Sequence, residues 1–122
     1  MKKIDLYSGF ESDPNIVFRQ RKISNEIIEE LELWYGYFYT IVELIPMVEN
    51  PHPDSLLFHW YNRSGFFNHT KWECKRIREL YEQVLSVQDK VPAMEAEAYD
   101  ALKQILLSTM RNNSRLFIAY GC

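Results

Sequence analysis

The longest regular pattern of hydrophobic positions in this sequence runs from Ser24 to Ile45 and predicts an α-helix. Its apolar residues recur at steps of three and four, the spacing that places side chains on one face of a helix. They are Ile27, Leu31, Trp34, Phe38, Ile41 and Ile45. Pro46 follows directly and cannot continue a helix. We therefore expect a central helix over residues 24–45, on whose apolar face the other helices pack.

Two further helices are predicted in the second half of the chain. The T-x-x-E sequence from Thr70 to Glu73 is a capping box and favours a helix start there, with the helix running to about Lys90. Its inward residues would be Ile77, Leu80, Tyr81, Val84 and Val87. Pro92 suits the first turn of the next helix, where its missing amide hydrogen is harmless. The inward residues of that helix would be Met94, Ala98, Leu102, Ile105, Leu106 and Thr109.

The remaining segments carry weaker patterns. Residues 1–22 read as a loop with short extended pieces, for example 16–19. Asp54 is placed to cap a short helix over 55–62, although that run and the apolar tail 116–120 also fit buried strands, and periodicity cannot separate the two. Taken together, the pattern predicts a mainly α fold: a single domain over residues 1–122, built as an antiparallel helical bundle with short extended segments at its N- and C-terminal ends.

Composition limits the classes of protein to consider. The chain has 122 residues, 47% of them hydrophobic, which is enough for one domain with a substantial core. A net charge of −3 and a pI near 5.6 argue against a protein whose overall field attracts nucleic acid. Only Cys74 and Cys122 are present, too few for a disulfide framework, so we expect a reducing cytoplasm. The sequence predicts neither a signal peptide nor a membrane segment.

No pattern for catalysis or for a cofactor is present. The histidines His52, His59 and His69 and the two cysteines lack zinc-ligand spacing, so no metal site is predicted. No local grouping of serine or cysteine with histidine indicates a nucleophile and its base. The four glycines stand in neither a phosphate loop nor a dinucleotide fingerprint. We therefore predict a protein that is not an enzyme and holds no cofactor.

Two alternatives from other functional classes stay open. Glu26, Glu29 and Glu32 have the spacing with which helical nucleotide hydrolases hold magnesium, which would make the protein a magnesium-dependent enzyme of that kind. In the second alternative, Lys71, Lys75 and Arg78 grip phosphates close to Trp72, as in a nucleic-acid-binding regulator.

The outer side of the predicted central helix is the favoured functional surface. It would present Glu29, Glu32, Tyr39 and Glu43, which combine acidic charge with an aromatic ring that can anchor in a partner protein. Aromatic residues are also dense in the runs WYGYFY and FHWYNRSGFF, beyond what a core of this size hides. We therefore predict that Glu29, Glu32, Tyr39 and Glu43 bind another protein.

A small, acidic, aromatic-rich single domain of this kind resembles the bacterial immunity proteins that neutralise nuclease and other polymorphic toxins, as in colicin and contact-dependent growth inhibition systems. The resemblance is one of overall character across the whole chain. It implies a cytoplasmic, non-catalytic inhibitor that binds a cognate toxin directly. It also implies a mechanism in which an acidic face occupies the basic substrate channel of the toxin, in competition with phosphates.

Overall fold

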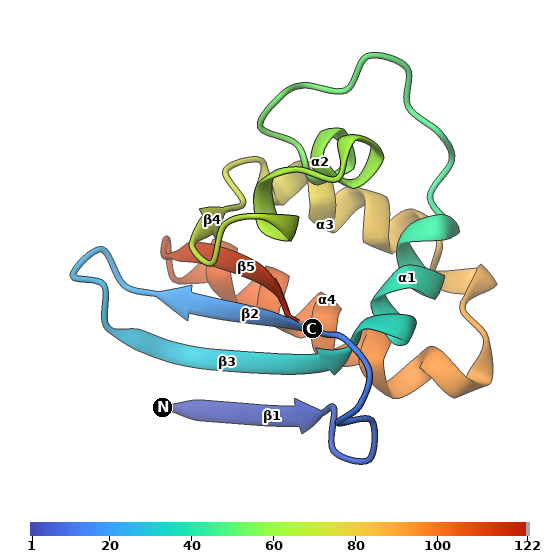
Figure 1. The fold of residues 1–122 in the computed structure, drawn as a ribbon. Coiled ribbons are helices and arrows are strands. Elements are labelled where there is room, and N and C mark those ends of the chain that lie inside the picture. The colour runs from blue at the N-terminus through green and yellow to red at the C-terminus, as the bar shows by residue number, and fades with distance from the viewer. Residues whose placement is uncertain (122) are drawn as a thin grey trace.

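A five-stranded sheet, and not a helical bundle, forms the centre of the protein (Figure 1). The computed structural model describes residues 1–121. Its strands are β1 (Lys2–Leu6), β2 (Asn15–Arg21), β3 (Ile27–Trp34), β4 (Trp72–Glu73) and β5 (Arg115–Gly121). The strand order is β1-β3-β2-β5-β4, with β1 parallel to β3 and the other pairs antiparallel. The predicted mainly α antiparallel bundle is therefore wrong, and the fold is mixed α/β.

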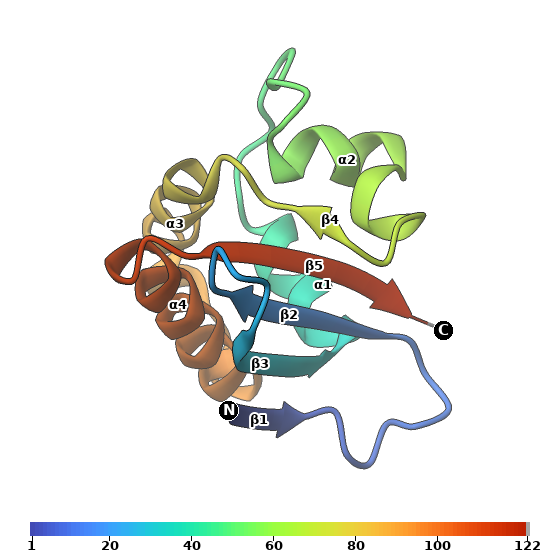
Figure 2. The ribbon, with the colours of Figure 1, turned by 90° about the vertical axis from the view of Figure 1, so that its left-hand side faces the viewer.

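The main helices are gathered on one side of this sheet. They are α1 (Tyr35–Glu43), α2 (Leu56–Asn62), α3 (Ile77–Ser86) and α4 (Ala96–Arg111), with short 3-10 turns at Gly65–Phe67, Gln88–Lys90 and Ala93–Glu95. Helices α1 and α4 pack against the strands, α3 packs against α4, and α2 lies beside β4 (Figures 1 and 2). Figures 1 and 2 show α1, α3 and α4 on the same side of the sheet and no helix of residues 1–121 over its other face. The protein therefore has one covered and one open sheet face.

The core lies between the covered sheet face and the helices. Alternate residues of the middle strands point into it, as the period of a strand requires. The sheet contributes Ile16, Phe18, Leu31, Leu33, Leu116 and Ile118, and the helices contribute Phe38, Ile41, Val42, Leu80, Val84, Ala98, Leu102, Ile105 and Leu106, all buried. Each large aliphatic or aromatic side chain buried here stabilises the fold by about 1.5–3 kcal/mol.

The predicted central helix over residues 24–45 is a strand followed by a shorter helix. Along β3, Glu29, Leu31 and Leu33 are buried while Glu30 and Glu32 are only partly covered, which is a period of two. The chain becomes helical only at Tyr35. Backbone pairing with β1 and β2, which lie far away in the sequence, satisfies the amides and carbonyls of β3, and a local hydrophobic pattern does not reveal such pairing.

The predicted capping box overlaps the sheet. Thr70 lies in a turn, Trp72 and Glu73 form β4 and pair with Ile118 and Phe117 of β5, and α3 begins only at Ile77. Glu73 pairs with Arg115 on the neighbouring strand, 2.9 Å away, and does not cap a helix. The helix start predicted at residue 70 is therefore wrong, because Glu73 pairs with a residue across the sheet and its backbone belongs to β4.

The structure resolves the ambiguous segments and supports part of the helix assignments. Residues 56–62 form α2, whose first turn is capped by Ser55, not by Asp54. The tail is an inner strand of the sheet, β5, and the predicted extended piece at 16–19 lies in β2. The inward residues predicted for α4 are buried, except Met94, which is 80% exposed. Within residues 1–121, none of the helices has the length and apolar character needed to cross a membrane.

Candidate functional site

The residues predicted to form one acidic binding surface lie in separate environments. Glu29 and Glu32 are on β3, three positions apart, so their side chains point to opposite faces of the sheet. Tyr39 and Glu43 are both exposed and lie one turn apart on α1, which places them side by side. The structure therefore brings together Tyr39 and Glu43 but separates them from Glu29 and Glu32.

Glu29 belongs to a polar network between the sheet and α4. Its side chain is 7% exposed, accepts a hydrogen bond from Gln20 Nε2 at 3.0 Å and lies 3.5 Å from Lys2 Nζ. Gln20 Nε2 also donates to Ser108 Oγ at 3.0 Å, and the side-chain oxygen Gln20 Oε1 accepts from Asn112 Nδ2 and Ser114 Oγ. The carboxylate of Glu29 is thus occupied in joining the strands to α4.

The other glutamates of the magnesium alternative lie elsewhere. Glu32 is on the open sheet face and accepts a hydrogen bond from Asn15 Nδ2 at 2.7 Å. Glu26 is exposed in the turn before β3, where it pairs with Lys22 at 3.5 Å. Glu26, Glu29 and Glu32 therefore share no helix face, which that alternative requires. In the described part of the chain, no three histidine, cysteine, aspartate or glutamate residues are grouped to hold a metal ion.

A cluster of aromatic rings joins α1 to α2, with Trp60 at its centre. The Trp60 ring lies 5.7 Å from Phe38, 6.0 Å from Tyr35 and 5.8 Å from Tyr39, all on α1, measured between ring centroids. Phe67 lies 5.9 Å from Trp60 on another side. Such ring contacts add about 0.5–1.5 kcal/mol each to the hydrophobic burial, so the cluster fixes α2 against α1.

Trp60 also contacts two side chains of opposite charge, Glu43 and Arg63. Its indole Nε1 donates a hydrogen bond to Glu43 Oε2 at 2.9 Å. The Arg63 guanidinium lies 5.8 Å from the Trp60 ring and 4.8 Å from the Phe67 ring, and donates to the Tyr35 hydroxyl at 3.1 Å. A single buried indole thus orients one carboxylate and one guanidinium at the surface.

His59 and Ser64 hold the end of α2 in the conformation that places Arg63 over the rings. His59 Nε2 lies 2.8 Å from the carbonyl oxygen of Pro53 and therefore carries the proton, so Nδ1 accepts from Ser64 Oγ at 2.8 Å. Between them, Arg63 has a φ of 52°, the left-handed conformation that ends many helices. This serine and histidine are close enough for a nucleophile and its base, but here they close the last turn of α2.

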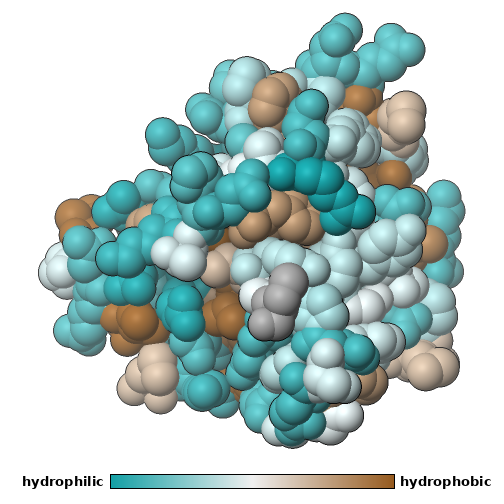
Figure 3. Space-filling view, in the orientation of Figure 1, coloured by the Kyte–Doolittle hydropathy of each residue, from teal (hydrophilic) through white to brown (hydrophobic). Residues whose placement is uncertain are grey.

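Several residues of this cluster, of α2 and of the loop after α1 are exposed around the buried Trp60. We name this set the aromatic surface; it consists of Tyr35, Tyr39, Glu43, Met47, Val48, Trp60, Tyr61 and Arg63. Tyr39 is 45% exposed, Tyr61 39% and Met47 83%, and the Val48 amide donates to the Tyr61 hydroxyl at 3.1 Å, which fixes the loop after α1 against α2. In Figure 3, pale surface of intermediate hydropathy, the range of tyrosine and tryptophan, covers the area where Figure 1 places α1.

Part of this surface was visible in the sequence. The density of aromatic residues in WYGYFY and FHWYNRSGFF indicated rings beyond the needs of the core, and Tyr39 and Glu43 were among the predicted binding residues. Sequence reasoning missed Trp60, Tyr61 and Arg63 as neighbours of Tyr39. Their proximity depends on the way α2 packs on α1, and the intervening loop gives no signal of it.

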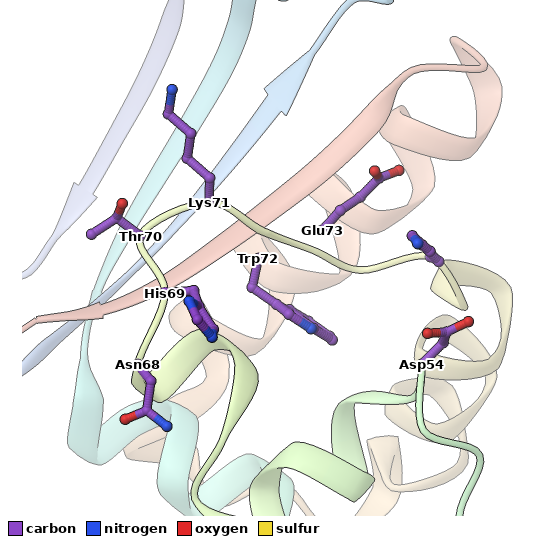
Figure 4. A pocket seen from close by; sticks show the side chains of 8 residues that line it. Asp54, Asn68, His69, Thr70, Lys71, Trp72 and Glu73 are labelled. Atoms are coloured by element: carbon purple, nitrogen blue, oxygen red, sulfur yellow. The ribbon is translucent and has the colours of Figure 1, made fainter.

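A second candidate site is a hollow of about 660 Å³ beside β4 (Figure 4). It is lined by Asp54, Asn68, His69, Thr70, Lys71, Trp72, Glu73 and Lys75. Figure 4 shows Lys71 extending away from His69 and Trp72. Arg78, the third basic residue of the nucleic-acid alternative, lines a neighbouring hollow together with Lys75, Arg76, Glu79 and Glu82. Lys75 and Arg78 thus share one hollow, Lys71 lies apart from Arg78, and acidic residues lie among the basic ones in both hollows.

Comparison with known proteins gives no relative from which to infer a function. No family model matches the chain, no curated protein matches its sequence and no solved structure matches its fold.

Proposed function

We propose that this protein is a non-catalytic inhibitor that binds another protein in the cytoplasm, and specifically that it is an immunity protein that neutralises a cognate bacterial toxin, a nuclease, by direct contact. The observation that supports this proposal is the aromatic surface. Tyrosine, tryptophan and arginine are enriched among the few residues that dominate the binding energy of protein interfaces. Here Tyr39 and Arg63 lie against the packed Trp60, and the exposed Tyr61 follows it in α2.

The packing beneath this surface favours tight binding. Side chains that are ordered before association lose less conformational entropy when a partner binds. Trp60 is 7% exposed and contacts Tyr39, while the Tyr61 hydroxyl is held by the Val48 amide. The surface is thus an ordered arrangement of partly exposed rings with a carboxylate, Glu43, at its border. In the proposed mechanism this surface covers a basic region of the toxin and blocks access for its substrate.

The test uses the product of the neighbouring gene as the candidate toxin. Producing that protein in a bacterium should stop growth, and coproduction of this chain should restore growth. In surface kinetics, Tyr39→Ala should raise the dissociation rate roughly 30-fold, equivalent to about 2 kcal/mol, because a central anchor ring acts mainly after the encounter.

Ile23→Ala is the matched control for Tyr39→Ala. Ile23 is an apolar side chain, 80% exposed, in the turn between β2 and β3, away from the aromatic surface, and its variant should bind like the parent. A complex whose rates were unchanged by both Tyr39→Ala and Tyr61→Ala would exclude the aromatic surface as the interface. If the neighbouring product neither binds this chain nor is neutralised by it, the proposed immunity function is wrong.

A further inference from the structure

We infer that the aromatic surface receives an arginine side chain of the partner protein, which stacks on the Tyr39 ring and donates hydrogen bonds to Glu43. This inference rests on the proposed function, since it specifies how the partner is recognised. The proposed site consists of Tyr39 and Glu43, which are neighbours on α1, and of the Trp60 indole, which orients the Glu43 carboxylate.

The first reason is the state of the Glu43 carboxylate. Its Oε2 accepts from Trp60 Nε1, which holds the carboxylate in one orientation. Within residues 1–121, its Oε1 has no hydrogen-bond partner and no lysine, arginine or histidine nitrogen lies within 4.0 Å of the carboxylate. Glu43 is thus an exposed, oriented acceptor whose charge is left uncompensated by the protein itself.

The second reason is the ring beside this carboxylate. Tyr39 lies one helical turn before Glu43, and 45% of its surface is accessible. A cation over the face of a tyrosine ring is attracted by the negative charge of the π-system. The ring and the carboxylate therefore offer two attractive contacts to the same positive group, at the spacing of neighbouring turns.

The protein itself provides the third reason, because the other side of the cluster already holds a guanidinium. Arg63 lies 4.8 Å from the Phe67 ring and donates to the Tyr35 hydroxyl, a combination of stacking and hydrogen bonding. Tyr39 and Glu43 likewise offer an aromatic ring and an oxygen acceptor, here a carboxylate, without a cation of their own. A planar guanidinium stacks on a ring and donates sideways at once, which a lysine ammonium does not, so arginine is the expected side chain.

The charge around Glu43 points to the same partner chemistry. Glu49 is exposed in the loop that follows α1, next to Val48 of the aromatic surface, and adds a second negative charge there. The positive charge nearby, Arg63, is engaged with the rings of Trp60 and Phe67. A basic partner segment is therefore attracted toward α1, and its arginine meets an acceptor that needs no rearrangement.

The test is a titration of the full chain with N-acetyl-arginine amide, followed through the tryptophan indole N–H signals in an ¹H–¹⁵N spectrum. Because the Trp60 indole is bonded to Glu43, its signal should shift and saturate at millimolar ligand, the range expected for one side chain. The signals of Trp34 and Trp72 should stay in place, since both residues lie outside the aromatic surface. N-acetyl-citrulline amide, an uncharged analogue of nearly the same shape, should produce no saturating shift.

Glu43→Gln is the matched variant, because the glutamine carbonyl can still accept from the Trp60 indole while the negative charge is gone. It should weaken binding of the arginine amide by about 3- to 10-fold. Equal shifts with the arginine and citrulline compounds, or no shift of the Trp60 signal, would overturn the inference. If either of these results were found while Tyr39→Ala strongly weakened toxin binding, only the arginine inference would be wrong and the proposed function would still hold. A saturating arginine site in a chain that fails to bind the toxin would instead reject the proposed function alone.

Discussion

At the scale of single residues, Trp60 explains why the aromatic surface is both ordered and charged. Its ring packs on Phe38 in the core, while its nitrogen reaches Glu43 at the surface. A buried indole N–H without a partner is costly, so the bond to Glu43 satisfies the tryptophan and fixes the carboxylate at once. The candidate site is therefore an outward extension of the core, and its geometry depends on the same packing that stabilises the fold.

Cys74 gives a prediction at this scale. It is 3% exposed, and burial, followed by the negative charges of Glu79 and Glu73, raises the pKa of its thiol from 9.0 to about 12. The thiolate, which is the reactive form, is therefore roughly a thousandfold rarer near pH 8 than in an unfolded chain. In a Cys122→Ser variant, Cys74 should react with a chromogenic disulfide reagent at least about 100-fold more slowly in the native protein than in denaturant.

The same pKa shift affects stability in alkaline solution. Folding raises the pKa of this thiol, so only the unfolded chain loses the proton as the pH rises from 9.0 toward about 12. The contribution of Cys74 to stability is present below pH 9.0 and is lost across that window. A Cys74→Ala variant should lose less of its stability over the same window than the parent. In the labelling experiment described above, a rapid reaction of native Cys74 with the disulfide reagent would contradict its burial.

At the scale of elements, the junction between β3 and α1 shows what the sequence could and could not reveal. The alternation Glu30, Leu31, Glu32, Leu33 has the period of a strand and was available in the sequence, but Ile27 and Leu31 also fit a helical repeat. Positions four apart lie on one side of both a helix and a strand. Only the pairing with β1 and β2 decides between the two, and that information is distributed along the chain.

The elements that the sequence predicted well are those whose evidence is local. The inner side of α4 follows from its own apolar spacing, as the burial of Leu102, Ile105 and Leu106 confirms. By contrast, β4 has only two residues and is defined by its pairing with β5. The T-x-x-E sequence from Thr70 to Glu73, which overlaps β4, therefore indicated a helix start that does not exist. At the candidate site, the sequence could predict that Tyr39 and Glu43 are neighbours because both lie on α1, whereas Trp60 lies on a different helix, α2.

Gly36, in the first turn of α1, gives a prediction at the scale of elements. A methyl group at this position would lie 2.5 Å from the Trp34 ring, and that ring is also stacked on Phe10, with a distance of 4.3 Å between the ring centroids. Gly36→Ala should therefore lower the free energy of unfolding by about 1–3 kcal/mol, although alanine is the better helix former by about 1 kcal/mol. Denaturant unfolding measures the change.

The double variant Trp34→Ala, Gly36→Ala separates the contact from the helix preference. Trp34→Ala removes the three atoms closest to the added methyl group, so adding Gly36→Ala to Trp34→Ala should be neutral or stabilising. A loss of stability in both backgrounds would show that Gly36 is needed for its backbone conformation and not for the space it leaves to Trp34.

At the scale of the whole molecule, the glutamates first assigned to one surface occupy three different regions, and their substitutions should separate accordingly. Glu29→Lys should lower the free energy of unfolding by about 3–5 kcal/mol, because it places a positive charge beside Lys2 in a nearly closed polar network. Glu32→Lys, on the open sheet face, should cost less than about 1 kcal/mol. Glu43→Lys should cost about 1 kcal/mol through the lost bond to Trp60.

Binding should rank the same three variants in a different order. Glu43→Lys should slow association with the toxin and weaken the dependence of that rate on salt, because it reverses the charge that the partner meets on the aromatic surface. Glu32→Lys should associate like the parent, since the open sheet face lies apart from α1, and Glu29→Lys should lose binding only to the extent that it unfolds. Denaturant unfolding and surface kinetics on the same three proteins measure both orders. A Glu32→Lys protein that folds normally but associates slowly would move the interface to the open face of the sheet.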